Sequence, residues 1–176
     1  MKNTVKNTAF AGMFLALCMV LPMITGNIPE VGQMLCPMHV PVLLCGFVCG
    51  WPYGLLVGAI APLLRSLIFG MPAMYPAAAA MAFELATYGL LTGVLYRVFP
   101  KKDGYIYPTL FIAMIGGRLV WGAARYIMAG LSGSTFGMQA FLAGALTNAI
   151  PGIILHIVIV PAVVIAFRRA KLMDTE

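Results

Sequence analysis

Charged residues are scarce in this sequence. Only 9% of its 176 residues are Asp, Glu, Lys or Arg, and only five of these are acidic. A soluble domain carries about 25% charged residues. With 62% hydrophobic residues and a mean hydropathy of +0.98, the chain does not have the composition of a soluble domain. We therefore predict an all-α integral membrane protein whose residues 1–176 form a single transmembrane domain.

Catalytic motifs are also missing. The sequence contains no Gly-x-x-x-x-Gly-Lys-Ser/Thr phosphate loop, so it does not hydrolyse ATP by that route. Neither Gly-x-Ser-x-Gly nor His-Glu-x-x-His occurs. Ser132 and Ser134 belong to a loop and have no adjacent base in the sequence. We therefore expect a protein that is not an enzyme and uses no cofactor.

The cysteines do not indicate a disulfide framework or a metal site. Cys18, Cys36, Cys45 and Cys49 lie in or beside apolar runs, where thiols usually serve packing. Along a helix, Cys45 and Cys49 would lie roughly 9 and 15 Å beyond His39, too far for all to reach one ion. No metal is expected.

Six apolar segments divide the chain. They cover residues 5–25, 34–50, 54–69, 77–99, 105–129 and 138–167, against a hydrocarbon core of about 30 Å. The first is read as a retained helix, because no convincing signal-peptide cleavage site follows it. The second contains Pro37 and Pro41, which predicts an irregular start and a helix after His39. Trp51-Pro52-Tyr53 is expected to form a tight turn.

The distribution of basic residues predicts the orientation. Six crossings place both termini on one side, and eight basic residues fall there: Lys2, Lys6, Arg97, Lys101, Lys102, Arg168, Arg169 and Lys171. The opposite loops contain Glu30 but no Lys or Arg. By the positive-inside rule, both termini are cytoplasmic. These residues mark topology, and no nucleic-acid partner is expected.

Three arginines remain inside the predicted spans, and they face one acidic residue. Arg65, Arg118, Arg125 and Glu84 are costly in a membrane unless they face a protein interior or a wet cavity. Arg65 and Glu84 flank a turn at similar depth, so they form either a structural bridge or part of a site. The surplus of arginine favours a site for a small anionic solute that enters from outside.

Other polar residues lie in the same outer half of the predicted bundle. Trp121 lies between Arg118 and Arg125 on one helix face, because these arginines are seven residues apart. His39 and Asn148 are also placed in this half. His156 falls in the inner half and is expected to be a packing residue.

Small residues spaced four apart permit close helix contacts. Gly12 with Ala16, and Gly54 with Gly58, form such pairs. Packing within the chain and docking of a second membrane protein both remain open for them.

Several motifs together resemble a known family. They are Gly12-x-x-x-Ala16, Met38-His39-Val40-Pro41-Val42-Leu43-Leu44, Gly50-Trp51-Pro52-Tyr53-Gly54 and Glu84-Leu85-Ala86-Thr87-Tyr88-Gly89. In a six-span protein of this length, they resemble the substrate-binding S component of an energy-coupling factor (ECF) vitamin transporter.

The resemblance implies a partner set and a site. An S component in a prokaryotic cell membrane binds a water-soluble vitamin from outside and joins a transmembrane coupling protein and two cytoplasmic ATPases. The implied substrate-binding residues are His39, Arg65, Glu84, Tyr88, Arg118, Trp121, Arg125 and Asn148, and the implied docking residues are Gly12, Ala16, Gly54 and Gly58. The arginines favour an anionic vitamin such as pantothenate. Pyridoxine or hydroxymethylpyrimidine is the alternative vitamin, and a self-contained small-solute transporter is the alternative class.

Overall fold

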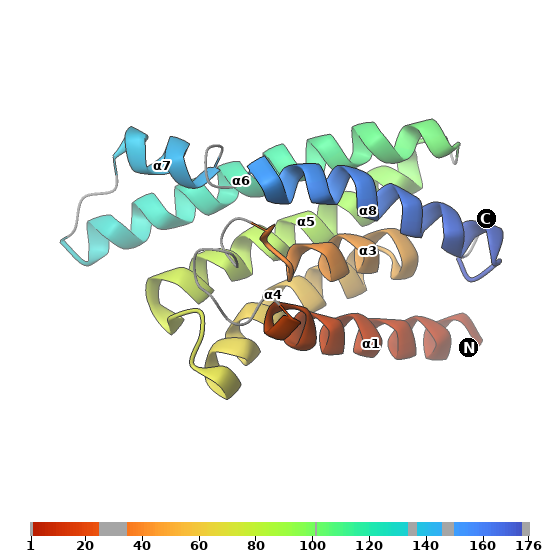
Figure 1. Ribbon diagram of the computed structural model, residues 1–176, viewed down its shortest axis with the longest axis horizontal. Coiled ribbons are helices and arrows are strands. Elements are labelled where there is room, and N and C mark those ends of the chain that lie inside the picture. Colours follow the sequence, from red (N-terminus) through yellow and green to blue (C-terminus); the bar gives the residue numbers. More distant parts are fainter. Residues whose placement is uncertain (1, 25–34, 101, 134–136, 146–149, 174–176) are drawn as a thin grey trace.

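The structure, a computed structural model, describes residues 2–24, 35–100, 102–133, 137–145 and 150–173 as a helical bundle. Its elements are α1 (Lys2–Ile24), α3 (His39–Cys49), α4 (Trp51–Phe69), η1 (Met74–Ala78), α5 (Ala79–Val98), η2 (Asp103–Tyr105), α6 (Ile106–Leu131), α7 (Met138–Ala145) and α8 (Ile150–Arg169). Both termini lie at one end of the bundle (Figure 1). We call this the termini end, and the opposite end, where α4 turns into α5, the hairpin end.

Five helical stretches in the described chain are apolar and long enough to cross a membrane: Thr4–Met23, Trp51–Phe69, Met74–Val98, Asp103–Leu131 and Ile150–Arg169. The second predicted segment is different. Its helix α3 has 11 residues and therefore extends about 17 Å, roughly half of a hydrocarbon core. As expected, α3 begins at His39 after the turn residues Pro37 and Met38.

The short helix α3 is the centre of the bundle. All eleven of its residues are buried, and α1, α4, α5 and α8 pack around it. Leu43 and Cys45 are fully buried there, together with Leu85 of α5 and Val160 of α8. Because its sequence is apolar on every side, α3 can be surrounded by neighbours in this way.

Helices α4 and α5 pack through glycines. A Cβ atom on Gly54 would lie 2.6 Å from the carbonyl oxygen of Gly89, and one on Gly58 would overlap the backbone of Leu85. The two backbones can approach this closely only because side chains are absent. Gly54 and Gly58 therefore serve close packing of α4 against α5 within the chain.

The small residues of α1 are exposed, in contrast to the packed glycines of α4. A Cβ atom on Gly12 would meet no atom within 4 Å, and Ala16, one turn further, is also exposed. Phe14 and Cys18 on the other face of α1 are buried in the core. The small-residue pair of α1 thus lies on an open face of the bundle.

Two local expectations are wrong. Trp51-Pro52-Tyr53 is not a turn but the first turn of α4, where proline is tolerated because the first N–H groups of a helix lack partners anyway. The chain reverses at Gly50 instead, whose φ of 88° suits glycine. The predicted segment 138–167 contains two helices, α7 and α8, rather than one.

The hairpin end is shaped by the α4–α5 connection. Gly70 adopts φ 70° and its N–H donates to the carbonyl oxygen of Ser66 at 2.9 Å, which ends α4. After the turn, the Tyr75 hydroxyl donates to the carbonyl oxygen of Met128 in α6 at 2.8 Å. This hydrogen bond ties the hairpin to the last turns of α6.

Candidate functional site

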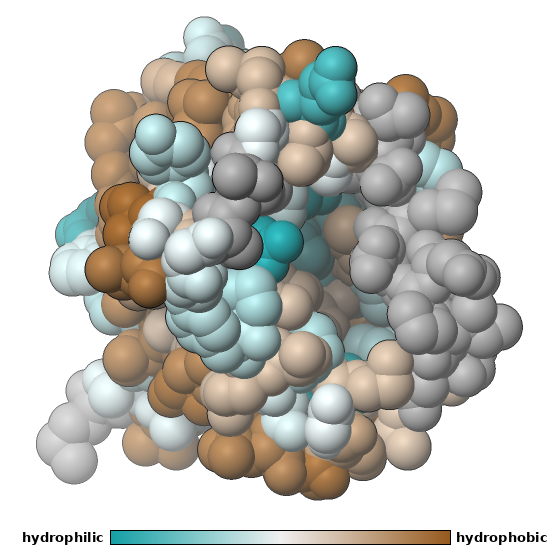
Figure 2. All heavy atoms as spheres, turned by 90° about the vertical axis from the view of Figure 1, so that its left-hand side faces the viewer, coloured by the Kyte–Doolittle hydropathy of each residue, from teal (hydrophilic) through white to brown (hydrophobic). Residues whose placement is uncertain are grey.

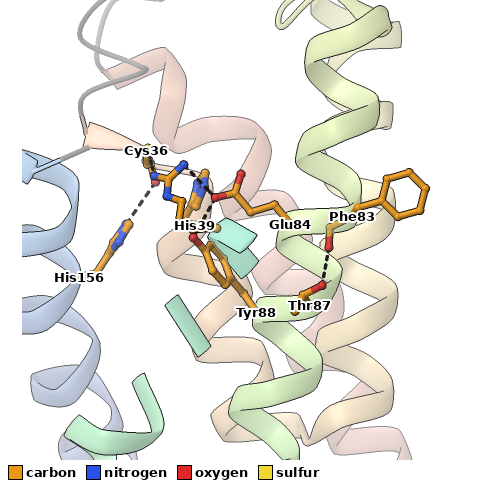
Figure 3. A network of polar contacts seen from close by, with 8 residues as sticks. Cys36, His39, Phe83, Glu84, Thr87, Tyr88 and His156 are labelled. Carbon is orange, nitrogen blue, oxygen red and sulfur yellow. Dashed lines mark hydrogen bonds and ion pairs between the residues drawn. The ribbon is translucent and has the colours of Figure 1, made fainter. Parts of the chain in front are cut away.

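Glu84 of α5 is the centre of a buried polar cluster between α3, α5 and α6. Its side chain is 1% exposed. Its Oε1 accepts a hydrogen bond from the Tyr88 hydroxyl at 2.8 Å and lies 3.0 Å from Nη1 of Arg118 and 3.5 Å from Nε2 of His39 (Figure 3). Tyr88 follows Glu84 by one helical turn, so both side chains leave α5 on the same face. A buried carboxylate is tolerated only with such partners.

The cluster extends to α8 through Cys36, which lies three residues before the start of α3. Arg118 Nη2 contacts the Cys36 sulfur at 3.7 Å, and the Cys36 carbonyl oxygen lies 3.4 Å from Nε2 of His156. The rings of His156 and His39 are nearly parallel, with centroids 5.8 Å apart. We refer to Cys36, His39, Glu84, Tyr88, Arg118 and His156 as the Glu84 cluster.

An aromatic pair lies next to the cluster, further toward the hairpin end. The Arg118 guanidinium lies 6.0 Å from the ring of Trp121, and that ring stacks on Phe141 of α7 at 6.3 Å. Gly144 makes room for the indole, since a Cβ there would lie 2.6 Å from its ring. Helix α7 thus holds Trp121 in place beside the cluster.

Arg125 continues this face of α6. It lies seven residues beyond Arg118, which corresponds to about 10.5 Å along the helix axis. Arg118, Trp121 and Arg125 therefore form a polar and aromatic strip that leads from the Glu84 cluster toward the hairpin end. We call it the α6 strip.

The surface agrees with a site that opens at this end. Figure 2 views the hairpin end and shows a recess near its centre with hydrophilic side chains at the bottom. Apolar side chains form much of the surrounding surface (Figure 2). Such a recess in an otherwise apolar protein suits a small polar solute.

The comparison with protein families is decisive for identity. Residues 6–164 match the family model of the ECF transporter, substrate-specific component. The chain belongs to this family. It is therefore a transport protein and not an enzyme, as the sequence predicted, and the family implies a vitamin or another small solute and an ECF module as its partner. No curated protein and no solved structure matches the chain.

In this substrate-specific component, Arg65 does not join Glu84. Its Nη1 donates to the carbonyl oxygen of Met19 at 2.7 Å, and its guanidinium lies 5.1 Å from the ring of Phe69. The bridge considered between Arg65 and Glu84 is thus replaced by the pair of Arg118 and Glu84. Arg65 is 4% exposed and supports the contact of α4 with α1.

Two residues of the cluster were missed by sequence reasoning. The prediction of a single span over residues 138–167 places His156 in the inner half. Since α8 begins at Ile150, His156 lies only about 9 Å from the start of its helix and reaches the cluster. Cys36 contributes mainly through its backbone carbonyl group, and no sequence pattern predicts a backbone contact of this kind.

The remaining expectations concern Asn148 and metal binding. Asn148 lies outside the described residues. Within the described ranges, no group of three or more His, Cys, Asp or Glu residues could hold a metal ion. The cluster instead offers an ion pair, hydroxyl and imidazole groups, which bind solutes by hydrogen bonds.

Proposed function

We propose that this substrate-specific component captures a small anionic vitamin, with pantothenate as the first candidate, at the hairpin end. The α6 strip is the observation that carries the proposal. It joins a buried ion pair, an aromatic ring and a second arginine, Arg125, within about 10.5 Å. Charged side chains in a membrane protein usually mark a solute pathway.

The hairpin end is proposed to face the outside of a prokaryotic cell. Exposed basic residues gather at the termini end, where Arg97, Lys102 and Arg169 lie near the ends of α5, η2 and α8. The positive-inside rule then makes both termini cytoplasmic. Helix α3 belongs to the predicted segment 34–50, which would supply the sixth crossing.

The energy is proposed to come from partners. A transmembrane coupling protein and two cytoplasmic ATPases would drive release of the solute to the inside. The open face of α1 around Gly12 and Ala16 is the proposed docking surface, because small residues let a partner helix approach closely.

A neutral vitamin is the alternative, and one observation favours it. Arg118 is already matched by Glu84 at 3.0 Å, so the deepest positive charge is not available for an anion. Pyridoxine or hydroxymethylpyrimidine would then use the hydrogen-bonding groups of the cluster. A self-contained small-solute transporter is the alternative to an ATP-driven importer.

One experiment separates these possibilities. The protein is purified in detergent, and mass spectrometry identifies the small molecule that copurifies with it. Titrations with pantothenate, pyridoxine and hydroxymethylpyrimidine then rank the candidates. Uptake into vesicles is measured with and without the ATPase module, and full uptake by the isolated chain without ATP would refute the proposed importer.

A further inference from the structure

The two ends of the α6 strip differ in chemistry. Its inner end is Arg118, which joins the Glu84 cluster, and its outer end is Arg125. At the inner end, the three partners that Glu84 has among the described residues all meet its Oε1. Its other oxygen, Oε2, points away from them (Figure 3). A carboxylate oxygen is an acceptor only, so this atom is suited to a hydroxyl or amino donor of a solute.

His39 adds a second group of the same kind. The residue is 2% exposed, and neither of its ring nitrogens has a hydrogen-bond partner within the part of the chain that the structure describes. Nε2 lies 3.5 Å from Oε1 of Glu84, and when Nε2 carries the proton, Nδ1 is an acceptor. Buried polar atoms are nearly always hydrogen-bonded in native proteins, so an orphan here indicates a place for an external donor.

The inner end does not attract an anion. Arg118 and Glu84 form an ion pair with opposite charges 3.0 Å apart, so the positive charge of Arg118 is already balanced there. The outer end of the strip carries the guanidinium of Arg125, which favours a carboxylate or phosphate. The indole of Trp121 lies between the two ends.

We propose that the solute lies along the α6 strip in one orientation. Its hydroxyl or amino donors face Glu84 and His39, its acidic group faces Arg125, and its apolar middle contacts Trp121. The ligand class is therefore an elongated acid of about 10 Å with donors at the far end. This inference rests on the proposed function, and pantothenate has this constitution, with two hydroxyl groups at one end and a carboxylate at the other.

Substitution at Arg125 tests the outer end. The full chain is titrated with pantothenate and with panthenol, in which a hydroxymethyl group replaces the carboxylate. Wild type should prefer pantothenate roughly ten- to hundredfold, the range of one hydrogen bond to a charged group. Arg125→Gln should bind the two compounds within about threefold. The matched control Arg97→Gln, exposed at the far end of α5, should keep the wild-type preference.

Substitution at His39 tests the inner end. The second probe is N-(3,3-dimethylbutanoyl)-β-alanine, which is pantothenate without its hydroxyl groups. His39→Phe should lower the preference for the hydroxylated compound at least about threefold and leave the preference for the acid unchanged. If Arg125→Gln instead removes the hydroxyl preference, or His39→Phe the acid preference, the orientation is wrong.

The failure of the orientation and the failure of the proposed function look different. If wild type binds pantothenate but the two variants give the reversed or unchanged pattern, only the orientation is refuted. If wild type binds no pantothenate, the proposed vitamin and the orientation that rests on it both fail.

Discussion

At the scale of single residues, the sequence shows how deep a polar group lies but not which way it faces. Arg65 and Glu84 were placed at similar depth, and the bridge between them was one of two open roles. The structure turns Arg65 toward Met19 of α1 and brings Arg118 to Glu84. Rotation about a helix axis depends on packing with neighbours, which a single sequence does not contain. The sequence nevertheless predicted Glu84, Tyr88, Arg118 and His39 as residues of one site, and these four side chains lie in one cluster.

The first prediction concerns the ion pair. Arg118→Met leaves the Glu84 carboxylate buried without its cation, and breaking a buried pair in this way costs about 3–5 kcal/mol. The double variant Glu84→Gln with Arg118→Met removes both charges and should recover much of the loss. Thermal unfolding in detergent is the measurement. If the single and the double variant lose the same amount of stability, the proposed ion pair between Arg118 and Glu84 does not contribute as expected and the prediction is wrong.

The second prediction separates Arg65 and Arg125 by function. Arg65→Met removes the hydrogen bond to Met19 and should lower the unfolding temperature while solute affinity stays within about twofold. Arg125→Ala should instead lower solute affinity far more than it lowers thermal stability. Isothermal titration and thermal unfolding on the same preparations provide both quantities. Loss of affinity in Arg65→Met would instead support Arg65 as a substrate-binding residue.

At the scale of elements, apolar runs predicted most helices and missed their interruptions. The runs at 54–69, 77–99 and 105–129 correspond to α4, α5 and α6 within a few residues. The division of 138–167 into α7 and α8 left no clear mark, because both helices are apolar. That division brings Phe141 onto Trp121 and His156 into the Glu84 cluster. Hydropathy describes preference for lipid, and it cannot show where a helix stops inside an apolar run.

The third prediction uses two glycines with the same spacing motif and different surroundings. Gly58→Leu pushes a side chain into the backbone of α5 and should prevent stable folding. Gly12→Leu adds a side chain in open space, so folding and solute binding should be unchanged. ATP-driven uptake with the ECF module should nevertheless fall in Gly12→Leu, because the partner helix could no longer approach closely. Normal uptake would exclude this face of α1 as the docking surface.

At the scale of the whole molecule, topology and function are connected by the position of the recess. The Glu84 cluster and the α6 strip lie toward the hairpin end, whereas Asp103 and Arg168 form an ion pair of 2.6 Å at the termini end. A solute that enters at the hairpin end meets polar groups first and an apolar core behind them. Import therefore requires the hairpin end to face outward, and the orientation becomes the main test of the proposal.

The fourth prediction measures this orientation. The four native cysteines are buried, so single new cysteines can report on the two ends. Ser132→Cys replaces an exposed residue at the hairpin end, and Gly104→Cys replaces an exposed one at the termini end. A membrane-impermeant maleimide should label Ser132→Cys in intact cells, because the positive-inside rule places that end outside. Gly104→Cys should react only after the membrane is permeabilised, and wild type should remain unlabelled in both conditions. If only Gly104→Cys is labelled in intact cells, the termini end faces outward and the proposed orientation is wrong. The recess would then lie on the cytoplasmic side, where it could not receive a solute from outside.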